Sequence, residues 1–211
     1  MSLYRIEVIE IDAPDTGDER LAGRLREAGL PELGAVHASR LFFVESPADT
    51  PLDVATMRAI AADLLVDPIV ERFELLSAGQ EVRQPPGTTC VEVHPQPGVM
   101  DPVAESVLAE LRAAGRPVQS VRTARRYVLD GAFAAERVRQ TVARVLANEC
   151  IEEVVVGTLG LRSAPQPPLR EFRVRHVALR TLNEAGLDRP ARRGHLFLTP
   201  GEMSKGRAPL D

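Results

Sequence analysis

The side chains best suited to chemistry in this 211-residue chain are its histidines and cysteines, and their spacing argues against a shared site. The histidines share no motif and stand far apart, at His37, His94, His176 and His195. Cys90 and Cys150 make neither a disulfide framework nor a metal cluster, and we expect both to fill small buried positions. Phosphate-binding loops, dinucleotide fingerprints and metal-ligand spacings do not occur. The sequence therefore predicts no catalytic residue, no cofactor and no metal site.

Arginines and one Asp-Pro step are the remaining candidates. Arg40, Arg125 and Arg126 lie on or beside expected strands, where they are either a solvated face or a docking surface for an acidic partner. Because neighbouring residues on a strand point to opposite faces, only one of Arg125 and Arg126 can face outward, and the other is expected over the helices or paired with a carboxylate. Asp101 before Pro102 predicts a helix N-cap with proline at the first helical position, and a part in partner docking stays open.

Composition limits the class of protein. The chain has 26 basic and 30 acidic side chains, a net charge of −4 and 44% hydrophobic residues without tryptophan. This mildly acidic balance argues against nucleic acid as the main partner. Uninterrupted apolar stretches stay well short of the roughly 18 residues that a membrane span requires. The first residues are strand-like rather than a signal peptide, so we expect a cytoplasmic protein.

An internal repeat organises the elements that must position these residues. Residues 25–29 superpose on 111–115, and 38–43 on 124–129, at a shift of 86 residues. Residues 65–71 superpose on 146–152 at a shift of 81. The difference lies in one connection, as is usual for surface loops.

Each copy has the pattern strand, helix, strand, helix, strand. In the first copy Tyr4, Ile6 and Val8 alternate with Arg5 and Glu7, the period of a half-buried strand. A helix is expected over 18–28, a strand over 35–44, a helix after Asp53 and a strand over 69–76. We expect Leu64 on the buried stripe of the second helix of the first copy, and Val103 on that of the first helix of the second copy.

These patterns predict an α+β fold of two βαβαβ repeats, with antiparallel sheets and helices on one face. A copy of about 75 residues has a marginal core, so we expect two copies packed face to face as a pseudo-dimer. The expected divisions are residues 1–80, a linker at 81–88, residues 89–160, and a proline-rich connector and tail at 161–211.

The second copy resembles a known family. Three of its segments resemble, in order and spacing, motifs of the PurS-type small subunit of phosphoribosylformylglycinamidine synthase. They are 94–102, which follows a strand, 124–127, which lies on a strand, and 146–153. That family typically shows "KPGVLDPQG", a later basic "GK" strand and "LLANPVIEDY". Here Arg125-Arg126 stands in place of Gly-Lys. The likeness covers 89–157, and 3–77 more faintly through the repeat.

The resemblance implies a ferredoxin-like fold and a non-catalytic assembly role. Such subunits join the ATP-dependent synthetase to its glutaminase and assist ammonia transfer in purine biosynthesis, and in the fused, long form of the enzyme the N-terminal domain looks like two small subunits in one chain. The synthetase and glutaminase would then be the partners, with Asp101, Pro102, Arg125, Arg126 and Arg40 at the interface, and self-association is possible. The chain is expected to be a separate subunit or the leading piece of a longer enzyme.

Two other classes of function remain open from the residues. A tandem ferredoxin-like domain can be a regulatory module that binds an amino acid or a nucleotide between its copies. That reading needs glycine-rich turns at the interface, whereas Gly29 and Gly115 are explained as helix stops. A small hydrolase would need a nucleophile and base, which the sequence does not supply.

Overall fold

The computed structural model describes residues 2–11, 17–158 and 202. All of them except Glu202 belong to one compact unit, Met1–Pro168. Its first half contains β1 (Ser2–Glu10), α1 (Glu19–Ala28), β2 (Val36–Ser46), α2 (Val54–Ile60) with a π-helical turn (Ala61–Leu65), and β3 (Glu71–Ser77). Its second half contains β4 (Thr88–Pro95), α3 (Pro102–Ala113), β5 (Ser120–Asp130), α4 (Ala135–Leu146) and β6 (Glu152–Val156). The predicted α+β class and the order of elements are confirmed.

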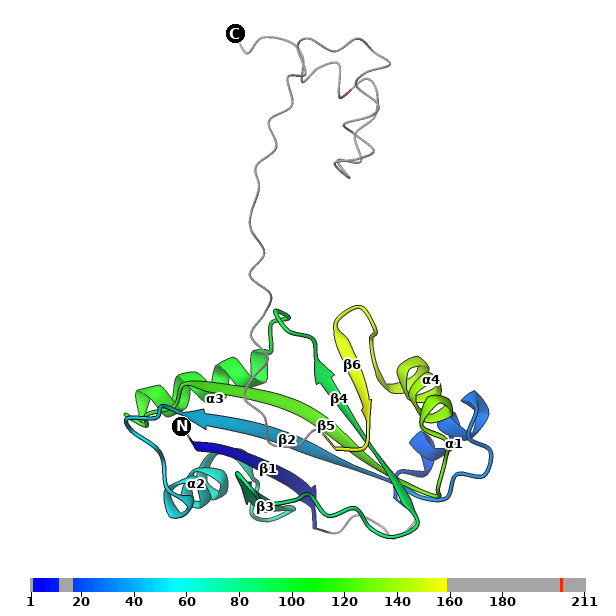
Figure 1. The fold of residues 1–211 in the computed structure, drawn as a ribbon, viewed down its shortest axis with the longest axis horizontal. Coiled ribbons are helices and arrows are strands. Elements are labelled where there is room, and N and C mark those ends of the chain that lie inside the picture. The colour runs from blue at the N-terminus through cyan, green and yellow to red at the C-terminus, as the bar shows by residue number, and fades with distance from the viewer. Residues whose placement is uncertain (1, 12–16, 159–201, 203–211) are drawn as a thin grey trace. The chain divides into compact units, whose positions relative to one another are not determined.

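The two halves share one antiparallel sheet of six strands, in the order β3-β1-β2-β5-β4-β6 (Figure 1). The order reads the same from either edge once β1, β2 and β3 are exchanged for β4, β5 and β6. The halves meet through the long pairing of β2 with β5, from Val36 opposite Leu129 to Glu45 opposite Ser120. The expected face-to-face packing is therefore wrong, because the halves join edge to edge through main-chain hydrogen bonds.

The strand pairing also corrects the repeat offset. Val8 lies opposite Arg40 in the first half, and Val93 lies opposite Arg125 in the second. Arg40 therefore corresponds to Arg125, at an offset of 85, and not to Arg126. The helix ends at Gly29 and Gly115 keep the offset of 86, so the connection from helix to strand is one residue shorter in the second half.

The four α-helices within residues 17–158 pack on one face of the sheet, as predicted, but each core combines both halves. Helices α2 and α3 lie together over one end of the sheet, and α1 and α4 over the other (Figure 1). Leu25 of α1 packs with Val91 and Val154 of the second half, whereas Leu111 of α3 packs with Ile6 of the first. Removing either half would expose the apolar face of a helix from the other, so neither core can form from one half alone.

Some expected core residues lie outside these clusters. Leu64 and Val103 are 40% and 52% exposed, because the buried stripes of their helices turn toward Met57, Ile60, Ala104 and Leu111. On the opposite sheet face, Leu41, Phe43 and Ala124 form a small apolar cluster of their own. Arg5 and Glu7 also lie on that face and are buried, so β1 is buried on both faces rather than half-buried.

Candidate functional site

Arg40 and Arg125 lie opposite each other at the centre of the helix face, where β2 pairs with β5. Like charges at directly opposed positions destabilise a sheet. Each arginine is neutralised by a carboxylate from the outer strand of its own half. Arg40 Nη2 donates to both oxygens of Glu71 at 2.7 Å, and Arg125 Nη2 donates to Glu152 Oε1 at 2.5 Å.

The two ion pairs are built alike. The main-chain N–H of Asp67 donates to Glu71 at 3.0 Å, and that of Asn148 donates to Glu152 at 2.8 Å. The arginine side chains are 50% and 42% exposed, and both glutamates are 22% exposed. Fixed carboxylates therefore hold two half-exposed guanidinium groups on the surface, a form suited to contacts with another protein.

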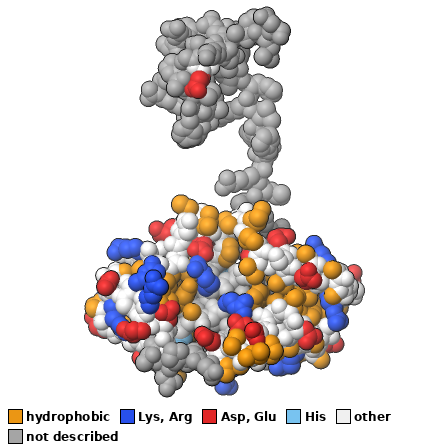
Figure 2. Space-filling view, turned by 180° about the vertical axis from the view of Figure 1, so that it is seen from behind, with side chains coloured by type: hydrophobic (Ala, Val, Ile, Leu, Met, Phe, Trp, Pro, Cys, Tyr) orange, Lys and Arg blue, Asp and Glu red, His pale blue; other side chains and the backbone are white. Residues whose placement is uncertain are grey.

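A shallow hollow of about 300 Å³ lies beside these pairs and is lined by Arg40, Glu71, Arg125 and Tyr127 among others. Burial is the main cause that raises the pKa of the Tyr127 phenol, so its hydroxyl stays protonated and can donate a hydrogen bond. Over the face drawn in Figure 2, charged side chains of both signs are interspersed with apolar ones. A mixture of this kind is not the continuous basic track that a polyanion needs.

Asp101 and Pro102 take the predicted positions at the start of α3. Asp101 Oδ1 accepts a hydrogen bond from the N–H of Ala104 at 3.0 Å, and Pro102 is the first residue of the helix. Asp101 Oδ2 accepts two more, from Thr123 N at 2.9 Å and Thr123 Oγ1 at 2.8 Å. The aspartate thus fixes the loop before α3 to β5, and that loop presents Met100, which is 80% exposed.

Arg126 points away from the surface that carries Arg125, as the alternation of strand residues predicts. Its side chain is buried on the opposite sheet face, where Nη1 donates to both oxygens of Glu7 on β1, at 2.8 and 2.7 Å. Nη2 donates to the carbonyl of Arg83 at 3.0 Å. Of the adjacent arginines, only Arg125 can meet a partner from the helix face.

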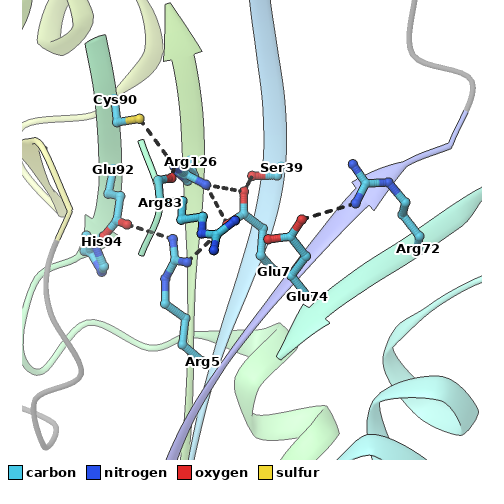
Figure 3. A network of polar contacts seen from close by, with 10 residues as sticks. All are labelled: Arg5, Glu7, Ser39, Arg72, Glu74, Arg83, Cys90, Glu92, His94 and Arg126. Carbon is cyan, nitrogen blue, oxygen red and sulfur yellow. Dashed lines mark hydrogen bonds and ion pairs between the residues drawn. The ribbon is translucent and has the colours of Figure 1, made fainter. Parts of the chain in front are cut away.

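A second buried arginine continues this network across the sheet (Figure 3). Arg5 of β1 donates to Glu7 at 3.1 Å and to Glu92 of β4 at 3.0 Å, and Glu92 also contacts His94 at 2.8 Å. We call Arg5, Glu7, Glu92 and Arg126 the crossing network. It spans the β2–β5 junction, so its ion pairs link the two halves.

Burial and ion pairing act in opposite directions on the crossing network. Burial raises the pKa of the Glu7 carboxyl, but hydrogen bonds from Arg126 and Ser39 and the charges of Arg126 and Arg5 outweigh it and hold that pKa below its usual value. For Arg126, burial lowers the guanidinium pKa, and the bonds to Glu7 raise it overall. Both groups are therefore charged in the folded chain, and loss of one leaves a buried charge without its partner.

The cysteines occupy different environments. Cys90 is buried in β4, as expected, and its sulfur contacts Arg126 Nη2 at 3.3 Å. Cys150 is exposed, because the helix ends at Leu146 and Cys150 lies in the turn before β6. The expectation of a buried Cys150 is therefore wrong. His176 and His195 lie outside the described residues.

The pairing of Arg126 with Glu7 confirms the expectation that one of Arg125 and Arg126 is paired with a carboxylate, but the sequence patterns missed the other members of the crossing network. Arg5, Glu7 and Glu92 alternate with apolar residues, which is also the pattern of a solvent-facing strand side. A signal for Glu7 and Glu92 is that they occupy corresponding positions at the offset of 85 residues. The sequence repeat, at a shift of 86, matched Glu7 with Val93 instead.

Within the described residues, His, Cys, Asp and Glu side chains form no group of three or more that could hold a metal ion. The helices in the same part of the chain are too short or too polar to cross a membrane.

A family model matches part of the chain. It is PurS, described as phosphoribosylformylglycinamidine (FGAM) synthase, and it matches residues 88–158. The matched range starts with the first residue of β4 and ends just after β6, so it covers the whole second half. No curated protein matches the chain.

Proposed function

Because residues 88–158 form a PurS-type domain, which associates the chain with phosphoribosylformylglycinamidine synthase and purine biosynthesis, we propose that the chain is a non-catalytic assembly component of that enzyme. In this role it joins the ATP-dependent synthetase to the glutaminase and assists the transfer of ammonia between them. The observation that carries the proposal is the family match over β4, α3, β5, α4 and β6 together.

The proposal extends to the first half of the chain. We take residues 1–80 as a second PurS-like repeat, 81–88 as the linker, 89–160 as the matched repeat and 161–211 as a connector, most of which lies outside the described residues. The common element order, the symmetric strand order and the corresponding Arg40–Glu71 and Arg125–Glu152 pairs support this division. One chain would then supply what two small subunits supply elsewhere.

The partner surface in this proposal includes Arg40 and Arg125 together with the loop fixed by Asp101 and Pro102. Half-exposed guanidinium groups and the exposed Met100 give it both charge and apolar area. Arg126 would support that surface from beneath the sheet, since it is buried.

Reconstitution tests the assembly role. The full chain is combined with purified synthetase and glutaminase, and glutamine-dependent formation of formylglycinamidine ribonucleotide is measured beside the ammonia-dependent reaction. We expect the chain to raise the glutamine-dependent rate, to leave the ammonia-dependent rate unchanged, and to consume neither glutamine nor ATP when alone. A chain that binds neither partner and leaves both rates unchanged would reject the proposal.

Charge reversal tests the surface. Arg125→Glu should weaken co-purification with the partners by a factor of roughly ten or more if its contact is desolvated, and by severalfold at an interface rim. Arg144→Glu, an exposed change on α4, is the matched control. Equal recovery of partners with both folded variants would place the docking surface elsewhere.

A further inference from the structure

The two outer strands of the sheet differ in how their free edges are covered. Just beyond the ends of β1 and β3, the N–H of Ile11 donates to the carbonyl of Val70 at 2.8 Å, in the register that pairs Glu10 with Glu71. Because hydrogen-bonded pairs alternate along an antiparallel ladder, the main-chain groups of Phe73 and Leu75 point away from β1. No hydrogen bond to them occurs among the residues that the structure describes.

The free edge of β6 is covered by side chains. The carbonyl of Val154 accepts a hydrogen bond from Arg139 Nη1 at 3.2 Å, and that of Glu152 accepts one from Gln96 Nε2 at 3.4 Å. Arg58 in α2 corresponds to Arg139 at the offset of 81, but its guanidinium lies over the Phe73 ring, 5.8 Å from the centroid. Arg139 therefore covers part of the β6 edge, whereas the corresponding Arg58 contacts a side chain of β3 and leaves its main chain open.

The sequence of β3 is complementary to itself. If two β3 strands pair antiparallel with Phe73 opposite Phe73, Arg72 of each copy lies opposite Glu74 of the other. Both side chains are exposed, at 54% and 61%, on the face away from the helices. They fall at the positions between hydrogen-bonded pairs, where opposed side chains come closest. The same pairing of β6 about Val154 would place Glu153 opposite Val155, without any charge match.

We propose that two copies of this chain associate through their β3 edges, in antiparallel register centred on Phe73. The two sheets then continue into each other across a twofold axis, as an isologous dimer requires. Phe73 pairs with its counterpart, and Leu75 N–H donates to the carbonyl of Glu71 in the other copy. Glu71 N–H already donates to Asp67 at 2.7 Å, so about four main-chain hydrogen bonds form and the dimer is weak and concentration-dependent.

Sedimentation velocity of the full chain over a concentration series tests this proposal. Wild type should shift from the 23.0 kDa monomer toward a species of twice that mass as concentration rises. Glu74→Arg places two arginines opposite each other at both symmetry-related positions, so it should raise the dissociation constant about tenfold or more. The double variant Arg72→Glu/Glu74→Arg restores opposite charges and should return the constant to near the wild-type value.

Glu153→Arg is the matched control, because Glu153 on β6 corresponds to Arg72 on β3 and should not affect the dimer. Circular dichroism confirms that each variant is folded. The proposal is overturned if wild type is monomeric over the whole series, if Glu74→Arg dimerises like wild type, or if the double variant stays as weak as Glu74→Arg.

Discussion

The two halves of the sheet carry corresponding ion pairs on the helix face but differ in the charged residues that they bury on the opposite face. Arg40 and Arg125, with their partners Glu71 and Glu152, are arranged alike. On the opposite face Glu7 and Glu92 correspond, yet Arg5 on β1 corresponds to Cys90 on β4. Glu92 therefore takes its arginine from β1, and Glu7 takes one of its two from β5. The ion pairs on the helix face are therefore repeated in the two halves, whereas the arginines of the buried ion pairs that link the halves are not.

The largest expected effect follows from removing the shared carboxylate of the crossing network. Glu7→Ala leaves Arg5 and Arg126 with fewer partners in a buried site, so the free energy of unfolding should fall by about 3–5 kcal/mol. Glu74→Ala is the control, because Glu74 lies opposite Glu7 on β3 but is exposed, and its effect should stay within about 0.5 kcal/mol. Urea unfolding measures both, and equal losses would contradict the importance of the crossing network.

Truncation of Leu25 tests its place at the centre of a core that contains residues of both halves. Leu25 is fully buried beside Val91 and Val154, so Leu25→Ala should cost about 3 kcal/mol. Leu64→Ala removes the same atoms from a position 40% exposed and should cost far less. Comparable losses in urea unfolding would show that Leu25 is not at the centre of a core.

Acid should weaken the crossing network in a defined direction. The pKa of Glu7 is lower in the folded chain than in the unfolded one, so the unfolded state binds more protons between the two values. The contribution of Glu7 is complete above the unfolded value of about 4.3 and is lost as pH falls through the lower folded value. Unfolding free energies of wild type should fall more steeply below about pH 4.3 than those of Glu7→Gln, and parallel curves would contradict this assignment.

The smallest effect compares two helix caps. Asp18 caps α1 by accepting from Leu21 N at 2.9 Å, whereas Asp101 caps α3 and also holds Thr123. Asp18→Ala should cost about 1 kcal/mol, and Asp101→Ala about 2 kcal/mol because the bonds to β5 are lost as well. Thermal unfolding distinguishes the two, and an equal loss would limit Asp101 to capping.

The order of elements was predictable because local signals specify it. Alternation in β1, the caps Asp53 and Asp101 and the helix stops at Gly29 and Gly115 all act over a few residues. Face-to-face packing was predicted wrongly, since no local pattern distinguishes a paired strand edge from a free one. The sequence repeat matched Arg40 with Arg126, whereas the strand register matches it with Arg125, and a shift of one residue moves a side chain to the other face.

The buried charges were not predictable for a different reason. Arg5, Glu7 and Glu92 are ordinary surface residues by composition, and their burial depends on partners that lie far away in the sequence. By contrast, Arg40 and Arg125 were identified as candidates from sequence, and the structure adds the carboxylates that hold them.

The central claim is that the halves form one cooperative structure, since each core contains one helix from each half. Residue-resolved hydrogen exchange of wild type and Leu25→Ala tests it most directly. Although Leu25 belongs to the first half of the chain, we predict that in Leu25→Ala the amides of β4, β5 and β6 lose as much protection as those of β2. Loss of protection confined to residues 17–77, with β4 to β6 unchanged, would contradict it.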